Sequence, residues 1–196
     1  MPANSEQSIS PEEILSNEYE YIAQTATQAH EDRSSVVSFF LIAVGSPLAA
    51  FFSTEVVGNT SLKFDISILF CGLFFILSVL GTTTILQLSR LRAAWYESML
   101  AMNQMKDFVI RNSSIDIEGA FRWRATTAPS KFKINSVSFY QAVEVAILSG
   151  LLFGAFIFFL LDVLKVSNPF IVWGASIGLG LLNIWFQIYL YRQLLK

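Results

Sequence analysis

The sequence predicts an all-α integral membrane protein, a four-helix bundle with both termini in the cytoplasm and helical extensions on that side. Composition is the first reason, because 54% of the 196 residues are hydrophobic and 14% are charged, against about 25% charged in soluble domains. The second is four apolar stretches, each near the roughly 20 residues that a helix needs to cross the hydrocarbon core. The third is the uneven distribution of lysine and arginine between the segments that connect them.

The four apolar stretches are the predicted spans, and they cover residues 34–54, 66–89, 136–161 and 166–191. Three of them hold no charged residue, and the third holds one, Glu144. A soluble helical bundle would need polar residues at helical spacing in these runs, and they are absent. No basic segment followed by an apolar stretch opens the chain, so the first span is expected to act as the insertion signal.

Lysine and arginine set the predicted orientation, because they are concentrated in the cytoplasmic connections of membrane proteins. The long connection at 90–135 holds eight of the 13 basic residues, the tail at 192–196 holds two, and Arg33 precedes the first span. Only Lys63 and Lys165 fall in the two short connections on the other side. Both termini are therefore predicted to be cytoplasmic.

Residues 1–33 are predicted to form an acidic amphipathic helix in the cytoplasm. Ser10 suits the N-cap, Pro11 the first helical position and Glu13 a capping box. No glycine or further proline follows before residue 45, so this helix should run directly into the first span and bend at Pro47. Its expected apolar face consists of Leu15, Tyr19, Ile22, Ala26 and Ala29.

The connection at 90–135 is predicted to begin as a helical stalk that continues the second span. Its apolar residues recur every three or four positions: Leu88, Leu91, Trp95, Met99, Met102, Met105 and Val109. We expect this stripe to pack against the N-terminal helix of the same chain, with a contact between subunits as the alternative. Charge favours the pairing, because residues 1–33 hold seven acidic and one basic residue, whereas 90–135 hold eight basic and four acidic.

Aromatic and basic residues alternate in the rest of this connection, just before the third span. Basic side chains near an anionic leaflet gain about 1 kcal/mol each, and tryptophan favours the headgroup level. Residues 115–124 are therefore predicted to form a short interfacial helix, and nucleic-acid binding is a weaker interpretation. The predicted lipid-headgroup contacts are Arg122, Trp123, Arg124, Lys131 and Lys133.

Glu144 is the one ionisable side chain predicted well inside a span, where carboxylates are costly and point to function. One interpretation is an ion pair with Arg33, Arg90 or Arg192 at the helix ends. The other is an intramembrane polar site for an ion or a proton, formed by Glu144, Gln141, Asn183 and Gln187, with Ser149 nearby. Threonines 82–84 are expected to bond to backbone carbonyls or, less commonly, to line a polar path.

Small residues at four-residue spacing predict close helix contacts in lipid. The third span carries Gly150 and Gly154, and the fourth carries Gly174 and Gly178. Ser176 and Gly180 are offset from the latter pair by two positions. A hairpin between these two spans is expected because their connection is short, and an interface between subunits is the alternative.

The sequence shows no motif of an enzyme, a cofactor site or a metal site. It has one histidine, His30, and one cysteine, Cys71, which excludes a paired-cysteine redox site, a thiolate zinc site or an internal disulfide. The sequence contains no P-loop, no dinucleotide-binding glycine motif and no metalloprotease motif. We therefore predict a protein without catalytic activity and without a cofactor.

The layout of residues 11–54 resembles small bacterial membrane effectors that are predicted to form pores in nucleotide-signalling defence systems. In those proteins an amphipathic cytoplasmic helix also leads directly into the first span. The segments 92–103 and 121–124 are similar to features of uncharacterised bacterial four-span membrane proteins. The resemblance implies a location in the inner membrane of the cell, and it indicates nothing about activity.

Two functions are favoured by these features, and a secondary transporter ranks third because four spans are few for one chain and its halves show no convincing internal repeat. The first is an oligomeric channel or membrane effector, indicated by the small-residue faces, by Glu144 and by a stalk that could report a signal. The second is a non-conducting scaffold or accessory subunit, indicated by the oppositely charged cytoplasmic segments. The expected partners are the lipid bilayer with its anionic headgroups, further copies of the chain, and a protein bound through the cytoplasmic helices. Nucleic acid is not expected.

Overall fold

The computed structural model describes residues 10–53, 63–114, 119, 121 and 123–196. Within these residues the chain forms helices and no strand, as predicted. The elements are α1 (Pro11–Ser53), α2 (Lys63–Asn112), the single 3-10 turn η4 (Ala125–Thr127), α3 (Val137–Val163) and α4 (Pro169–Leu194).

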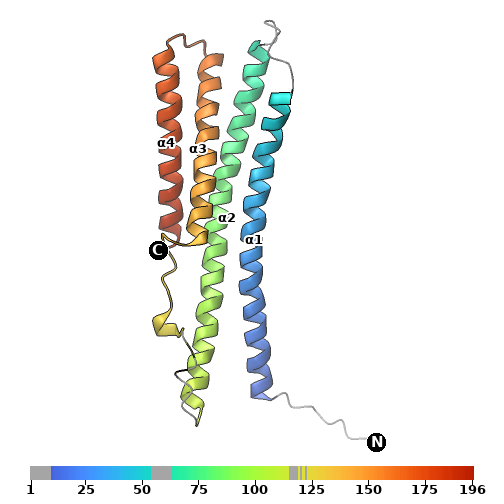
Figure 1. Ribbon diagram of the computed structural model, residues 1–196, viewed down its shortest axis with the longest axis vertical. Helices are drawn as coiled ribbons and strands as arrows, with labels where there is room; N and C mark the ends of the chain where they lie inside the picture. Colours follow the sequence, from blue (N-terminus) through green and yellow to red (C-terminus); the bar gives the residue numbers. More distant parts are fainter. Residues whose placement is uncertain (1–9, 54–62, 115–118, 120, 122) are drawn as a thin grey trace, which may run out of the picture.

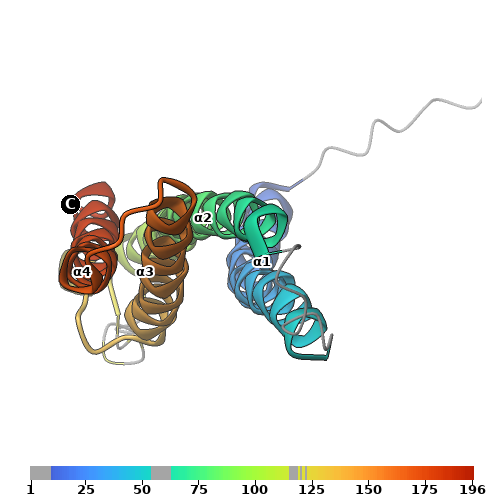
Figure 2. The same ribbon diagram turned by 90° about the horizontal axis from the view of Figure 1, so that it is seen from above.

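The four long helices run alternately up and down (Figure 1). α2 contacts α1 on one side and α3 on the other, and α3 in turn contacts α4. Seen from above, α1 and α4 lie at opposite ends of this row (Figure 2). The four helices that the sequence predicts are therefore arranged as an open row.

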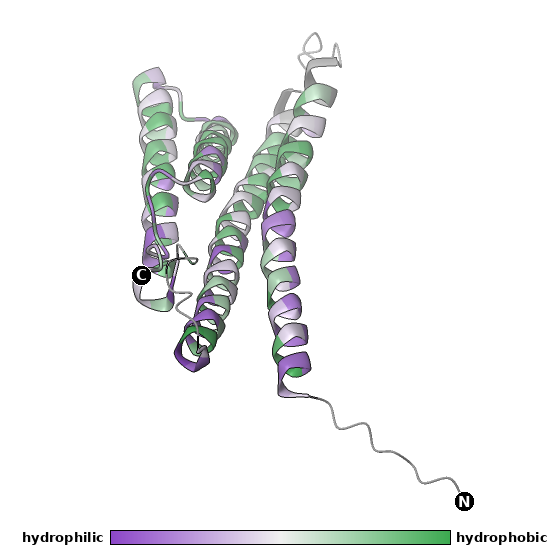
Figure 3. Ribbon diagram, turned by 60° about the horizontal axis from the view of Figure 1, so that its bottom comes forward, coloured by the Kyte–Doolittle hydropathy of each residue, from purple (hydrophilic) through white to green (hydrophobic). Residues whose placement is uncertain are grey.

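The molecule has an apolar end and a polar end. α2 from Ser67, α3 and α4 are long and apolar enough to cross a membrane, and no other helix in the described residues meets that criterion. α1 and α2 continue past the ends of α3 and α4, and this extension, the stalk, alternates hydrophilic and hydrophobic residues (Figure 3). The start of α1 and the end of α4 point toward the stalk side (Figure 1).

Both predicted continuous helices are confirmed from Pro11 onward, while residues 1–9 of the predicted N-terminal helix lie outside the described residues and the bend at Pro47 stays a prediction. α1 runs from the stalk through Pro47 without interruption, although this proline cannot donate to the carbonyl of Ala43. α2 spans 50 residues and joins the second apolar stretch to the stalk. Ser10 caps α1 as expected, because its hydroxyl accepts the Glu13 amide at 3.2 Å.

The fourth apolar helix begins three residues later than predicted. Lys165 has a φ of 57°, which places it in the left-handed region and ends the preceding helix there. Asn168 then caps α4, with its side-chain oxygen accepting the Phe170 amide at 3.0 Å. Pro169 occupies the first turn, where its missing amide hydrogen is not needed.

The stalk is formed by α1 and α2 of one chain, which confirms the predicted pairing within a subunit. Ala26 and Ala29 of α1 are buried, as is Met99 of α2. Farther from the apolar end, Tyr19 and Met105 line the same groove between the two helices. The described part of this interface is held by apolar contacts, and it contains no ion pair between α1 and α2.

Candidate functional site

A buried polar cluster joins α2, α3 and α4 within the apolar region. Its centre is Gln187 of α4, which is completely buried. The side-chain nitrogen of Gln187 lies 2.7 Å from the Ser149 hydroxyl, 2.8 Å from the Asn183 carbonyl oxygen and 3.1 Å from the Thr82 hydroxyl. Ser149 donates in turn to the backbone carbonyl of Ser78 at 3.2 Å. Three helices thus share one hydrogen-bond network.

This cluster is polar but carries no charge. An amide nitrogen has two hydrogens, so Gln187 serves two of its three acceptors at a time. Its carbonyl oxygen is buried and has no hydrogen-bond partner, and the same is true of the carbonyl oxygen of Gln141. The cluster has the groups needed to hold three helices in register, but among the described residues it has no acid or base for proton transfer.

Glu144 lies apart from the predicted polar site. It is exposed on α3 and has no hydrogen bond or ion pair with Gln141, Asn183 or Gln187. The only ion pair in the described residues joins Asp107 and Arg124, so the expected pairing of Glu144 with Arg33, Arg90 or Arg192 is wrong within one chain. The exposed stripe around Glu144 consists of Val137, Tyr140, Ile147 and Leu151.

The geometry explains why Glu144 is outside the cluster. Ala142, Val145 and Ser149 form the buried face of α3 that meets α2, and at 100° per residue Glu144 projects away from that face. It lies seven residues after Val137, about 10 Å along the helix axis. The carboxylate is thus about two turns inside α3, on a surface otherwise made of apolar side chains.

A seam of small residues holds α3 against α4. A Cβ added at Gly180 would lie 2.9 Å from the carbonyl oxygen of Gly150, and one added at Gly154 would lie 2.9 Å from the carbonyl oxygen of Ser176. The predicted hairpin between the third and fourth spans is therefore confirmed. Gly150 and Gly154 have their predicted roles.

The partners on α4 differ from the prediction. A Cβ added at Gly174 or Gly178 would meet nothing within 4 Å, so these two glycines do not form the contact with α3. Ser176 and Gly180, two positions away in each case, face α3 and are buried. Both pairs have the same four-residue spacing, and the direction of the neighbouring helix decides between them.

The three consecutive threonines of α2 bond to their own helix. The hydroxyls of Thr83 and Thr84 donate to the carbonyl of Leu80 at 2.8 and 2.9 Å, and that of Thr82 donates to the carbonyl of Ser78 at 3.2 Å. This is the more common of the two expected roles. Thr82 alone also joins the Gln187 cluster.

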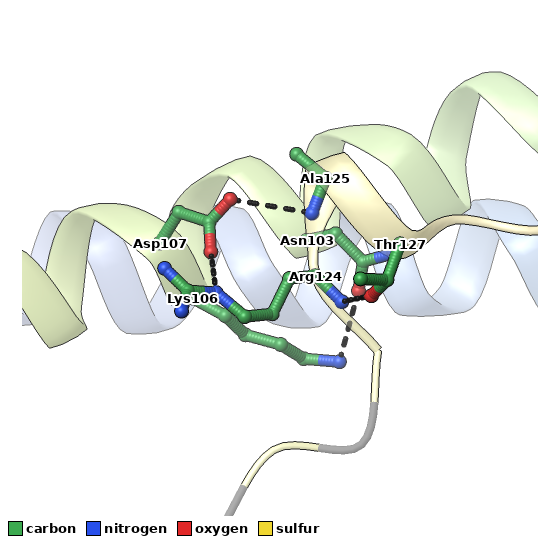
Figure 4. Close-up of polar contacts among 6 residues, drawn as sticks. All are labelled: Asn103, Lys106, Asp107, Arg124, Ala125 and Thr127. Carbon is green, nitrogen blue, oxygen red and sulfur yellow. Dashed lines mark hydrogen bonds and ion pairs between the residues drawn. The ribbon is translucent and has the colours of Figure 1, made fainter. Parts of the chain in front are cut away.

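On the stalk, Asp107 of α2 holds the connection that returns toward the membrane region (Figure 4). One carboxylate oxygen accepts the Arg124 guanidinium at 2.7 Å, and the other accepts the backbone amide of Ala125 at 3.2 Å. Thr127 accepts the Arg124 amide at 3.0 Å and so closes the η4 turn. We call Asp107, Arg124, Ala125 and Thr127 the stalk clasp.

The stalk clasp sets the charge state of its carboxylate. The hydrogen bond from Arg124 holds the pKa of Asp107 below its usual range, and burial opposes this shift. The Ala125 amide and the charges of Arg124 and Arg111 lower the pKa further. The sequence reading did not single out Asp107, although it lies four residues after Asn103 and eight after Met99, on the face of α2 that is buried.

The structure places four of the five predicted headgroup residues. Trp123 is half exposed, whereas Arg124 is bound in the stalk clasp. The backbone carbonyls of Lys131 and Lys133 accept hydrogen bonds from Arg92 and Ser136. Arg122 lies outside the described residues, as does most of the predicted helix at 115–124. Between the end of α2 at Asn112 and the start of α3, the element defined in the described residues is η4.

Comparison with known proteins adds no relative. No family model matches the chain, and neither a curated protein nor a solved structure matches it. The geometry of the chain itself is therefore the basis for any function assigned to it.

Proposed function

We propose that this chain is a non-enzymatic, four-span protein of the cell inner membrane that works as an oligomer. The oligomer would be an ion channel or another membrane effector, with the stalk as its cytoplasmic assembly region. The observation that carries the proposal is the exposed carboxylate of Glu144, which lies two turns inside an apolar helix with no ion-pair partner among the described residues of its own chain.

A carboxylate in this position favours assembly with another subunit. An acidic side chain in a membrane helix is costly when it faces lipid, and it usually faces a neighbouring helix or a water-filled cavity. A second copy of the chain could supply either environment. The open row of helices supports this idea, because α1 and α4 at its two ends each leave one side free for another subunit (Figure 2).

The proposed topology has four spans with both termini in the cytoplasm. Residues 34–53 of α1 carry no charge and can supply the first span, in addition to the three helices that already meet the length and hydropathy criterion. The concentration of basic residues at 90–135 places the stalk on the cytoplasmic side. The start of α1 and the end of α4 on one side of the molecule agree with an even number of spans.

Two measurements on purified protein test the proposal. Light scattering after size exclusion in detergent should give a mass of at least two copies, and planar bilayers should show discrete conductance steps. Glu144→Gln should weaken assembly or reduce cation selectivity several-fold, because it removes the charge without changing the shape. Glu97→Gln, an exposed carboxylate on the stalk part of α2, is the matched control and should behave as wild type.

A monomeric particle whose bilayers stay silent would contradict the channel proposal. The second candidate, a non-conducting scaffold or accessory subunit, would then be preferred. It is supported by large apolar side chains exposed on the stalk, namely Ile14, Tyr21 and Phe108, which a cytoplasmic protein could cover. A photoreactive residue at position 108 should then crosslink one defined protein in native membranes, and the same residue at the exposed position Glu18 should not.

A further inference from the structure

A buried arginine interrupts the apolar face of α1 at the level where the stalk meets the apolar helices. Arg33 lies four residues after Ala29 and four before Val37, and all three are buried. Its side chain is 4% exposed. One of its terminal nitrogens donates to Nδ1 of His30 at 2.8 Å, while its buried Nε has no hydrogen-bond partner.

A second arginine, Arg92 of α2, is within electrostatic range of Arg33, and the residues next to them in the chain, Asp32 and Leu91, line one groove between α1 and α2. Arg92 is half buried, its Nε donates to the Lys131 carbonyl at 3.2 Å, and its guanidinium lies 4.4 Å from the centre of the Trp95 ring. Burial lowers the pKa of Arg33, and the nearby charge of Arg92 lowers it further. Arginine stays protonated even so, so two positive charges are held together.

No carboxylate among the described residues forms an ion pair with either arginine. The one ion pair among those residues is that of the stalk clasp, and neither arginine takes part in it. A buried charge without a counter-charge is strongly unfavourable, and two like charges add repulsion. An anion from outside the chain would remove both penalties at once.

The surroundings of the pair contain further polar groups. Tyr191 of α4 is within electrostatic range of both arginines, and its hydroxyl lies 2.7 Å from the Ser138 hydroxyl of α3. The carbonyl oxygen of Gln141 is buried nearby along α3, one turn from Ser138, without a partner. All four long helices therefore contribute a side chain at this level.

In the proposed topology, the level of the pair matches that of lipid phosphates. Arg33 directly precedes the uncharged stretch of α1, and Arg92 follows the end of the uncharged stretch of α2 by three residues. Guanidinium groups bind phosphate oxygens through paired hydrogen bonds, and they are the side chains best suited to do so where water is scarce.

We propose that Arg33 and Arg92 together bind one phosphate group, supplied by the headgroup of an anionic phospholipid. The phosphate enters from the half-buried Arg92 and accepts a hydrogen bond from the unpartnered Nε of Arg33. The site joins α1 to α2 where the stalk meets the membrane region. It rests on the proposed membrane spans but not on conduction or oligomer formation, so its failure can be distinguished from failure of the channel proposal.

The test is native mass spectrometry of the full chain, exchanged from detergent into phosphatidylglycerol or phosphatidylcholine. The wild type should retain one phosphatidylglycerol and should not retain phosphatidylcholine, whose ammonium group the arginines repel. Arg33→Gln and Arg92→Gln should each weaken retention at least tenfold. Arg90→Gln removes an exposed arginine from the same helix and should retain the lipid as wild type does.

A second arm separates the lipid from a soluble phosphate. Inorganic phosphate, compared with chloride at equal ionic strength, is added to delipidated protein while its thermal unfolding is followed. Suppose that phosphate stabilises the wild type, that neither glutamine variant is stabilised, and that phosphatidylglycerol is not retained. This result supports the phosphate site and shows that its ligand is a soluble phosphate. The proposal is overturned if the wild type and the three glutamine variants retain the lipid equally. It is also overturned if the wild type neither retains the lipid nor responds to phosphate. If Arg33→Gln does not fold, Arg92→Gln and Arg92→Lys carry the test, because Arg92 is only half buried.

Discussion

The two antiparallel helix pairs, α1–α2 and α3–α4, are held together by opposite means. In α1–α2 a large side chain fills the interface, because Phe40 of α1 is completely buried and reaches the backbone of α2 at Gly81. In α3–α4 the absence of side chains lets the backbones of Gly150 and Gly180 approach each other. Lipid tails are as apolar as the protein interior, so close packing and polar contacts determine helix association in a membrane. Truncating a buried side chain should therefore destabilise the α1–α2 pair, and enlarging a buried glycine should destabilise the α3–α4 pair.

The largest effect is expected for Phe40→Ala. Removing a fully buried ring leaves a cavity between α1 and α2, and such substitutions cost about 3 kcal/mol or more. The free energy of unfolding in mixed detergent micelles should fall accordingly. Phe39→Ala is the control, because Phe39 is 64% exposed, and equal losses for both variants would show that the interface does not depend on Phe40.

A smaller loss of about 2 kcal/mol is expected for Gly180→Ala, as for overpacked cores. The added methyl group would press on the Gly150 backbone, and a backbone atom cannot move aside by changing a rotamer. Gly178→Ala meets nothing within 4 Å and should be neutral or slightly stabilising, because alanine favours the helix. The same assay measures both variants. If Gly178→Ala were destabilised and Gly180→Ala were neutral, Gly178 and not Gly180 would face α3, which would contradict the structure.

The polar cluster should contribute less than either packing interface. Gln187→Leu keeps the volume and removes the hydrogen bonds to Ser149, Asn183 and Thr82, and we expect a loss of about 1 kcal/mol, as for polar contacts between membrane helices. Gln193→Leu, an exposed position on the same helix, is the control. A loss comparable to that of Phe40→Ala would make the cluster, and not packing, the main determinant of helix association.

The smallest effect concerns the stalk clasp and depends on pH. Because the folded pKa of Asp107 is depressed, its stabilising effect is complete above the unfolded value of about 3.9 and is lost as pH falls through the lower folded pKa. The amide resonance of Ala125 should therefore titrate with a midpoint below 3.9. Asp107→Asn should abolish this titration and leave the four long helices intact, whereas a midpoint above that value would contradict the ion pair.

The sequence predicted the helices better than it predicted their contacts. Long apolar stretches and capping residues such as Ser10 depend on local chemistry, and α1 and α2 run continuously where expected. The exact partners on α4 depend on helix rotation, which a repeated spacing does not specify. Gly174 with Gly178 and Ser176 with Gly180 have the same spacing, and only the position of α3 distinguishes them.

The polar residues also show that spacing along the sequence does not specify which helix faces meet. Asn183 and Gln187 meet as predicted, since a four-residue spacing places them on one face of α4. Glu144 does not join them because the buried face of α3 is rotated away from it. The contact between Asp107 and Arg124 joins residues 17 positions apart on different elements, and helical spacing relates only residues of one helix, so periodicity could not predict it.

The length of α2 has a mechanical consequence. Its 50 residues form a rod of about 75 Å that touches α1, α3, α4 and η4. A rigid rod of that length turns a tilt of one degree at one end into a displacement of about 1 Å at the other. Whatever binds the stalk therefore acts as on a lever whose other end lies at the far end of the apolar region, with the helices that pack against α2 as its fulcrum.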